Sequence, residues 1–313
     1  MILAQRLAVL TAFATLFLVG VGVLVRATGS GLGCPDWPTC HGSAIPPGHR
    51  EALIEFSHRF TAMVVGFLVV AVAILAWKHY RHVPIITWLA TATVPLVGIQ
   101  GILGAITVKR ELPPEVVATH LLTAMLVLSC EIAVAVAMYL EDPAHADQLS
   151  AAIEAPKRVG SLAFGALAWL AVTMWIGGYM AESGASTACS GWPLCNGSAL
   201  PAADDHEVTH MLHRYLAGAL IAFVIPLVVL AWRQRHELQW GRGFAVLLGS
   251  LYLAQVAVGA LNVWFTFPDV LTITHTVLAA SIWFTLSGAV ALTFYAQVRE
   301  ARPHALSKAG APA

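Results

Sequence analysis

Long apolar stretches alternate with short polar segments along the whole chain. Blocks of about 20 apolar residues, such as Leu7–Val25 and Phe60–Trp77, have the length that a helix needs to cross the hydrocarbon core of a bilayer. The blocks predict eight helices, over residues 7–27, 55–77, 84–108, 116–140, 160–181, 208–232, 243–266 and 270–297. The pattern therefore predicts an all-α polytopic membrane protein.

The composition agrees with this interpretation. Of the 313 residues, 58% are apolar and only 11% are charged, where a soluble domain carries about 25% charged residues. These values exclude a soluble enzyme, a nucleic-acid-binding protein and a secreted disulfide scaffold. They indicate that the chain lies in the lipid bilayer. The net charge is zero and points to no charged partner.

The chain repeats itself at an offset of 155 residues. Cys34 matches Cys189, and the register continues without a gap to His120, which matches His275. Each repeat has four helices, so both enter the membrane from the same side, and a pseudo-two-fold axis along the membrane normal is expected. The repeat also gives the first helix a counterpart, so we expect it to be a membrane span and not a signal peptide.

The repeat divides the chain into four parts. We expect two tandem four-helix bundles over residues 1–140 and 160–297, a cytoplasmic linker over 141–159, and a cytoplasmic tail over 298–313 that is disordered from Arg299 onward. If the N-terminus is cytoplasmic, 11 of the 17 Lys and Arg residues lie in cytoplasmic segments. Both termini are therefore predicted to be cytoplasmic, and the loops that contain the cysteines extracytoplasmic.

Four histidines lie near the outer ends of predicted helices and recur in both repeats. They are His58 and His120 in the first repeat and His213 and His275 in the second. Ionisable residues inside a membrane bundle are costly and indicate a function, although a single histidine can simply bond to a backbone carbonyl. Two in each four-helix unit suit axial ligation of a haem iron, whereas zinc needs three or four ligands.

Each repeat also has two cysteines, six residues apart, in an outer loop. Because the outer side is oxidising, we expect one disulfide between Cys34 and Cys40 and another between Cys189 and Cys195. A zinc site made by Cys34, Cys40 and His41 is the alternative, but the second repeat has an asparagine where that histidine would be needed. The remaining cysteine, Cys130, is expected to be a buried, inert thiol.

One position near the histidines breaks the symmetry between the repeats. Glu55 lies three residues before His58, so the two share a helix face, whereas the equivalent position in the second repeat is His210. A carboxylate at the edge of an apolar haem site can accept a proton or stabilise positive charge. The alternative is an acid that is favoured near a helix start by the helix dipole.

Three further charged residues lie in or beside the predicted spans. Glu131 lies about three turns deeper than His120 and has two possible roles, on a proton path or in a hydrogen bond to a neighbouring helix. Arg59 and Arg214 each follow a candidate ligand histidine, and they are candidates either for pairing with haem propionates or for interfacial anchoring.

Together these features resemble the haem A synthase family. The resemblance spans the whole chain: eight helices in two repeats, the segment Glu55-Phe-Ser-His58-Arg, the three later histidines, and a cysteine pair in both outer loops as in the bacterial form. The resemblance implies an oxidoreductase of the bacterial cell membrane that makes haem A for cytochrome oxidase. It would oxidise the C8 methyl group of haem O to a formyl group by two hydroxylations and loss of water.

The resemblance also implies roles for particular residues and partners. Glu55 would be catalytic, His58 and His120 would hold the substrate haem O, and His213 and His275 would be the axial ligands of a resident haem b. Haem O synthase, which is a farnesyltransferase, and a quinone or other electron acceptor are implied as partners.

Two other functions compete with this one. The first is a membrane electron carrier with haem b held by histidine pairs, but such a carrier needs haems near both membrane faces, and all four histidines lie near one. The second is a haem transporter or chaperone without chemistry, which gives no reason for the difference between Glu55 and His210.

Overall fold

The computed structural model describes residues 2–142, 157–235 and 240–309, and these are mostly helical, with no β-strand within those ranges. Eight spans in the described residues are long and apolar enough to cross a membrane, which confirms the predicted fold class. Seven spans are single helices: α1 Ile2–Ala27, α2 Arg50–Tyr80, α3 Pro84–Lys109, α4 Pro114–Leu140, α6 Lys157–Glu182, α9 Gly241–Trp264 and α10 Asp269–Ala309. The remaining span consists of α7 Asp205–Ala219 and α8 Ile221–Arg233, and a short 3-10 helix, η2 Ala185–Thr187, precedes it.

Several helices extend beyond the predicted apolar blocks. α2 begins at Arg50 because the His49 side chain accepts a hydrogen bond from the Ala52 N–H, and α7 begins at Asp205 because Asp204 caps it. At the other end of the chain, α10 continues to Ala309, so the expectation of disorder from Arg299 onward is wrong for residues 299–309. Most of the predicted linker, residues 143–156, lies outside the described residues.

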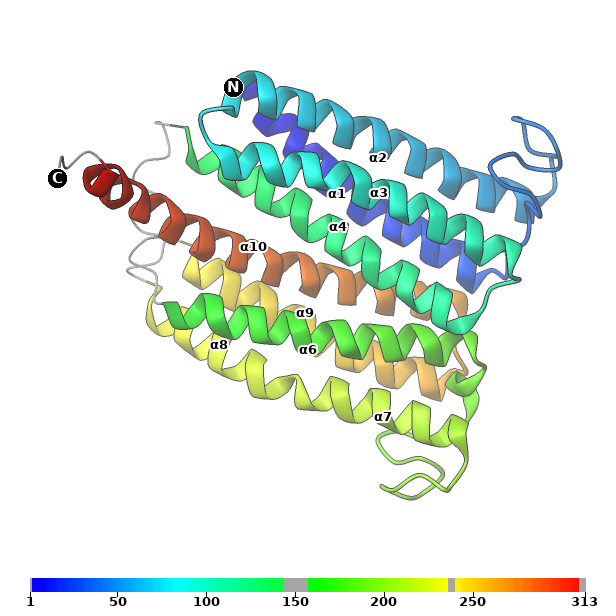
Figure 1. The fold of residues 1–313 in the computed structure, drawn as a ribbon. Helices are drawn as coiled ribbons and strands as arrows, with labels where there is room; N and C mark the ends of the chain where they lie inside the picture. The colour runs from blue at the N-terminus through cyan, green and yellow to red at the C-terminus, as the bar shows by residue number, and fades with distance from the viewer. Residues whose placement is uncertain (1, 143–156, 236–239, 310–313) are drawn as a thin grey trace.

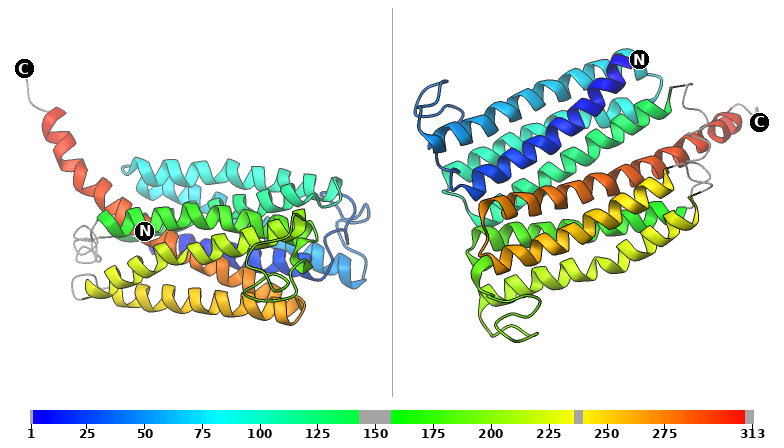
Figure 2. Two further views of the ribbon diagram at one scale, coloured as in Figure 1. Left: turned by 90° about the horizontal axis from the view of Figure 1, so that it is seen from below. Right: turned by 180° about the vertical axis from the view of Figure 1, so that it is seen from behind.

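The helices lie side by side, with the two cysteine-containing loops at one end of the bundle and both chain ends at the other (Figures 1 and 2). α1–α4 form one half and α6–α10 the other. α4 contacts α1, α6 and α10, so it joins the two halves. Polar contacts cross the same boundary, where Ser129 of α4 accepts a hydrogen bond from the Trp283 indole (2.8 Å) and contacts Ser287 (2.9 Å).

Local structure repeats at the sequence offset of 155. α1 and α6 begin at residues 2 and 157 and end at 27 and 182, and α4 and α10 begin at 114 and 269. Residues with a left-handed backbone also recur, as at His41 (φ 53°) and Asn196 (φ 50°). The repeat is thus present in helix bounds and loop conformations, while the two-fold axis itself stays a prediction.

The two halves differ in one helix. α2 is continuous, whereas its counterpart is interrupted at Leu220, and Pro226 lies six residues further along. Side chains of neighbouring helices bond to the backbone carbonyls before the interruption: Trp169 Nε1 donates to Leu216 O (2.7 Å) and the Tyr252 hydroxyl to Ala217 O (3.1 Å). The interruption is therefore held by specific hydrogen bonds.

Candidate functional site

Each of the four repeated histidines packs against a glycine of the neighbouring helix. A Cβ atom built on that glycine would lie close to the histidine Cε1, so the histidine ring occupies the space that a larger residue would fill. The pairs and distances are His58 with Gly22 (3.0 Å), His120 with Gly104 (3.5 Å), His213 with Gly177 (2.7 Å) and His275 with Gly259 (3.1 Å).

In the C-terminal half, His213 and His275 face each other with ring centroids 6.4 Å apart. Imidazole nitrogens ligate metal ions at about 2.0–2.1 Å, so two imidazoles on opposite sides of one ion have centroids roughly 6.3 Å apart. His213 Nδ1 lies 3.1 Å from the Thr173 carbonyl, which leaves its Nε2 for a metal. His275 Nδ1 is buried without a partner, and ligation through Nε2 would replace a contact with Gln255 (3.2 Å).

In the N-terminal half, His58 lies on α2 and His120 on α4. The Nδ1 atoms of both rings are buried without a hydrogen-bond partner. Gln100 donates to the His120 backbone carbonyl (3.0 Å), which fixes this part of α4 against α3. A buried imidazole nitrogen without a hydrogen-bond partner is energetically unfavourable. Two such nitrogens therefore fit a site that binds a metal-containing group.

The residues present in both halves therefore fit a haem that two histidines would hold. In each pair the histidines pack against glycines, and at least one buried ring nitrogen lacks a protein partner. In the C-terminal half, the buried Nε and Nη2 atoms of Arg214 also lack partners, as expected for groups that pair with a haem propionate.

Glu55 lies buried (4% exposed) beneath the first cysteine loop. Its carboxylate accepts a hydrogen bond from the Cys34 N–H (3.1 Å) and forms an ion pair with Arg59 (2.5 Å). Arg59 in turn donates to the carbonyls of Asp36 and Thr39 (2.6 Å each) and of Cys34 (2.8 Å). Glu55 and Arg59 thus form a clamp that connects α2 to the loop.

In the second cysteine loop, the arginine contacts are present but the carboxylate is not. Arg214 donates to the carbonyls of Gly191 (2.8 Å) and Leu194 (3.3 Å), which match Asp36 and Thr39 at the 155 offset. His210, at the position of Glu55, is 2% exposed and bonds instead to the Ala185 carbonyl (3.1 Å). The carboxylate is therefore a feature of the N-terminal half alone.

The structure joins Cys34 to Cys40 and Cys189 to Cys195 in disulfides, and Cys130 is a free thiol. The zinc alternative fails because His41 bonds to the Gly33 carbonyl (3.0 Å). Asn196 makes the same bond in the second loop, to the Ala188 carbonyl (3.0 Å), so the two residues share one structural role.

Asp36 organises the backbone of the first loop. It accepts hydrogen bonds from the Thr39 hydroxyl and from the N–H groups of His41 (2.5 Å) and Gly42 (2.8 Å). These bonds to the charged form, the one from Thr39 first, lower the pKa of Asp36 to about 2.

The sequence did not indicate the glycine partners of the histidines or the loop-binding role of the arginines. The recurrence of Gly22 and Gly177 in the repeat was the signal that could have revealed the former. The arginine contacts depend on the folded path of the loop backbone, which no spacing in the sequence shows.

Comparison with known proteins places this geometry in a family. The family model described as "Cytochrome oxidase assembly protein" (COX15-CtaA) matches residues 5–287. Two curated relatives are each 33% identical: the Heme A synthase of Shouchella clausii, over 73% of this chain and 75% of the relative, and that of Symbiobacterium thermophilum, over 85% and 87%. The Heme A synthase of Bacillus cereus strain ATCC 14579 is 28% identical over 96% of this chain and 97% of its own length. The chain therefore belongs to the COX15-CtaA family of cytochrome oxidase assembly proteins.

Proposed function

We propose that this chain is an enzyme of haem A biosynthesis that oxidises the C8 methyl group of haem O to a formyl group. Two successive hydroxylations would give a geminal diol, which loses water. The observation that carries the proposal is the pair of half-buried histidines in each half, packed against glycines, with three of the four Nδ1 atoms buried and unpartnered. Family membership and relatives named Heme A synthase support it.

We assign haem O to the N-terminal half, with His58 and His120 as its axial ligands, and a resident haem b to the C-terminal half, with His213 and His275. A bound haem b supplies one-electron chemistry. The assignment of the halves rests on Glu55, because only the N-terminal half has a carboxylate one turn from a ligand histidine.

Glu55 is proposed as the catalytic residue. Its buried carboxylate is held in place by Arg59 and the Cys34 N–H, so it meets the reacting group without reorganising. Oxidation of a methyl group on the porphyrin releases protons and develops positive charge at the ring edge. A fixed carboxylate stabilises that charge and accepts a proton.

We also propose the membrane arrangement and partners that the sequence indicates. The protein would lie in the bacterial cell membrane with both termini cytoplasmic and both disulfide loops outside, where disulfides persist. Both loops lie at one end of the bundle and both termini at the other, which supports this arrangement (Figure 1). Haem O would arrive from its farnesyltransferase, and a quinone or similar acceptor would take electrons.

Haem extraction and mass analysis of the purified protein test the function. We expect haem b together with haem A or a hydroxylated precursor, and conversion of added haem O. Haem b alone, with no conversion of haem O, would instead support an electron carrier or a haem-binding protein.

The role of Glu55 is tested with Glu55→Gln, which keeps the shape of the side chain. We expect haem O or its singly hydroxylated product to accumulate, with about a hundredfold slower conversion if about 3 kcal/mol of stabilisation is lost. His210→Gln is the matched control in the other half. Asp36→Asn disturbs the loop without touching Glu55, so an equal loss in that variant would assign Glu55 to holding the loop.

A further inference from the structure

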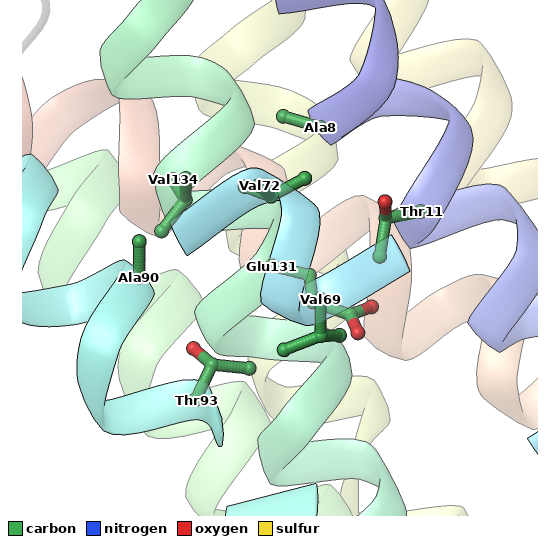
Figure 3. Close-up of a pocket in the computed structure, with 8 residues that line it drawn as sticks. All are labelled: Ala8, Thr11, Val69, Val72, Ala90, Thr93, Glu131 and Val134. Carbon is green, nitrogen blue, oxygen red and sulfur yellow. The ribbon is translucent and has the colours of Figure 1, made fainter. Parts of the chain in front are cut away.

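A small cavity of about 10 Å³ lies inside the N-terminal half, well away from the histidines. Most of its lining is aliphatic, and three polar side chains reach it, Glu131 of α4, Thr11 of α1 and Thr93 of α3 (Figure 3). Glu131 lies eleven residues beyond His120, about 16 Å along the helix axis. It therefore does not ligate an iron held by the histidines.

The Glu131 carboxyl group has no charged partner among the described residues. The residue is 5% exposed, and both of its carboxyl oxygens are buried. The Thr15 hydroxyl is the polar side chain that faces it, and the neighbouring titratable group is the Cys130 thiol. No Lys, Arg or His lines the cavity. A carboxyl group in such surroundings is stable only with its proton attached.

The C-terminal half shows that the fold does not need this acid. At the 155 offset, Glu131 corresponds to Leu286, Thr93 to Leu248 and Thr11 to Ala166, and all three counterparts are fully buried. Every residue that lines the cavity has a buried apolar counterpart in one packed core: Ala163, Ala166, Val224, Leu227, Ala245, Leu248, Leu286 and Ala289. The polar cavity is thus a second feature, besides Glu55, that only the N-terminal half has.

The cavity has room for about one water molecule, and its polar groups suit one. The Thr11 and Thr93 hydroxyls each donate to a carbonyl of their own helix, at 2.8 Å, which leaves their oxygens free to accept hydrogen bonds. A neutral carboxyl group can donate to a water and accept from it. The site can therefore hold a neutral carboxyl group with one water hydrogen-bonded to it.

We propose that Glu131 is a protonated carboxyl group that binds one internal water, and that its hydrogen bond to this water changes with the charge on the haem held by His58 and His120. The proposal rests on the proposed function. Its physical basis is that charges act over long distances in an apolar interior. A positive charge gained at the haem changes the field along the carboxyl O–H bond, so the hydrogen bond to the water changes in strength while the proton stays on Glu131.

Redox-difference infrared spectroscopy of the haem-loaded protein tests this directly. We expect a band of a protonated carboxyl group that changes when the haem is reduced at an electrode, shifts in D₂O, and is absent in Glu131→Gln. The control is Ser129→Ala, on the same helix but at the contact with α10, which should keep the band. A spectrum of Glu131→Gln identical to that of the wild type overturns the proposal.

Glu131→Leu supplies a second comparison, because it copies the other half and removes both the carboxyl group and the polar site for the water. We expect Glu131→Leu to keep its haem content and to lack the band, as Glu131→Gln does. A band retained in both variants overturns the proposal. If the wild type itself does not convert haem O, the proposed function fails, while the infrared result still decides whether Glu131 holds a proton.

Discussion

Replacement of Gly177 by alanine tests whether the glycine contacts position the haem ligands. The new Cβ would lie 2.7 Å from His213 Cε1 and 3.0 Å from Nδ1, where ordinary contact begins at 3.4 Å. The ring must therefore retreat by about 0.7 Å, or α6 must move away, because packed interiors have no slack at this scale. Either movement also disturbs the hydrogen bond between Nδ1 and the Thr173 carbonyl.

The expected magnitude follows from two opposing effects. Overpacking costs about 1–3 kcal/mol, while alanine in place of glycine stabilises a helix by about 1 kcal/mol. The free energy of unfolding therefore falls by at most about 2 kcal/mol. Because the strain is concentrated on a ligand ring, we expect haem binding to the C-terminal half to weaken about tenfold or more, at 1.4 kcal/mol per factor of ten.

The assay is the haem content per protein, from the absorption spectrum of the purified variant, together with its thermal unfolding. Gly104→Ala is the matched control, because its Cβ would lie 3.5 Å from His120 Cε1, an ordinary contact. Wild-type haem content in Gly177→Ala would refute the reasoning, and so would equal losses in the two variants.

Three predictions concern the loops. Alkylation of unreduced, denatured protein should label Cys130 alone, as shown by mass spectrometry. Because hydrogen bonds lower the pKa of Asp36 to about 2, its contribution to loop stability is full above about pH 4 and is lost as the pH falls toward 2; hydrogen exchange should show this loss, which Asp36→Asn removes. Arg214→Met removes the bonds to the second loop, so proteolysis at residues 189–195 should become faster while the disulfide remains.

The fold was predictable because its determinants are periodic and long. The eight apolar blocks and the offset of 155 gave the spans and the repeat without tertiary information. Helix ends were less predictable: α2 begins five residues early because its start depends on the His49 cap, not on apolar residues. α10 likewise continues beyond its apolar block, through residues that the composition alone suggested were disordered.

The candidate histidines could be picked out from the sequence, but their surroundings could not. The histidines stood out as ionisable residues repeated in apolar helices. The ion pair of Glu55 with Arg59 links residues one turn apart, yet its attachment to Cys34 depends on how the loop folds back over the helix. The isolation of Glu131 also depends on what three other helices place around it, which only the structure shows.

The shared hydrogen bond of His41 and Asn196 has a consequence for how the two halves can be exchanged. An imidazole and an amide reach the same backbone position, and both loops bind an arginine through matching carbonyls. Both loops therefore present the same backbone carbonyls to an arginine of the following helix, although the Asp36 side chain organises the backbone of the first loop alone. A chimaera that carries the second loop on both halves should assemble if Glu55 keeps an N–H group to bind, because the second loop keeps these carbonyls with a glycine at the position of Asp36.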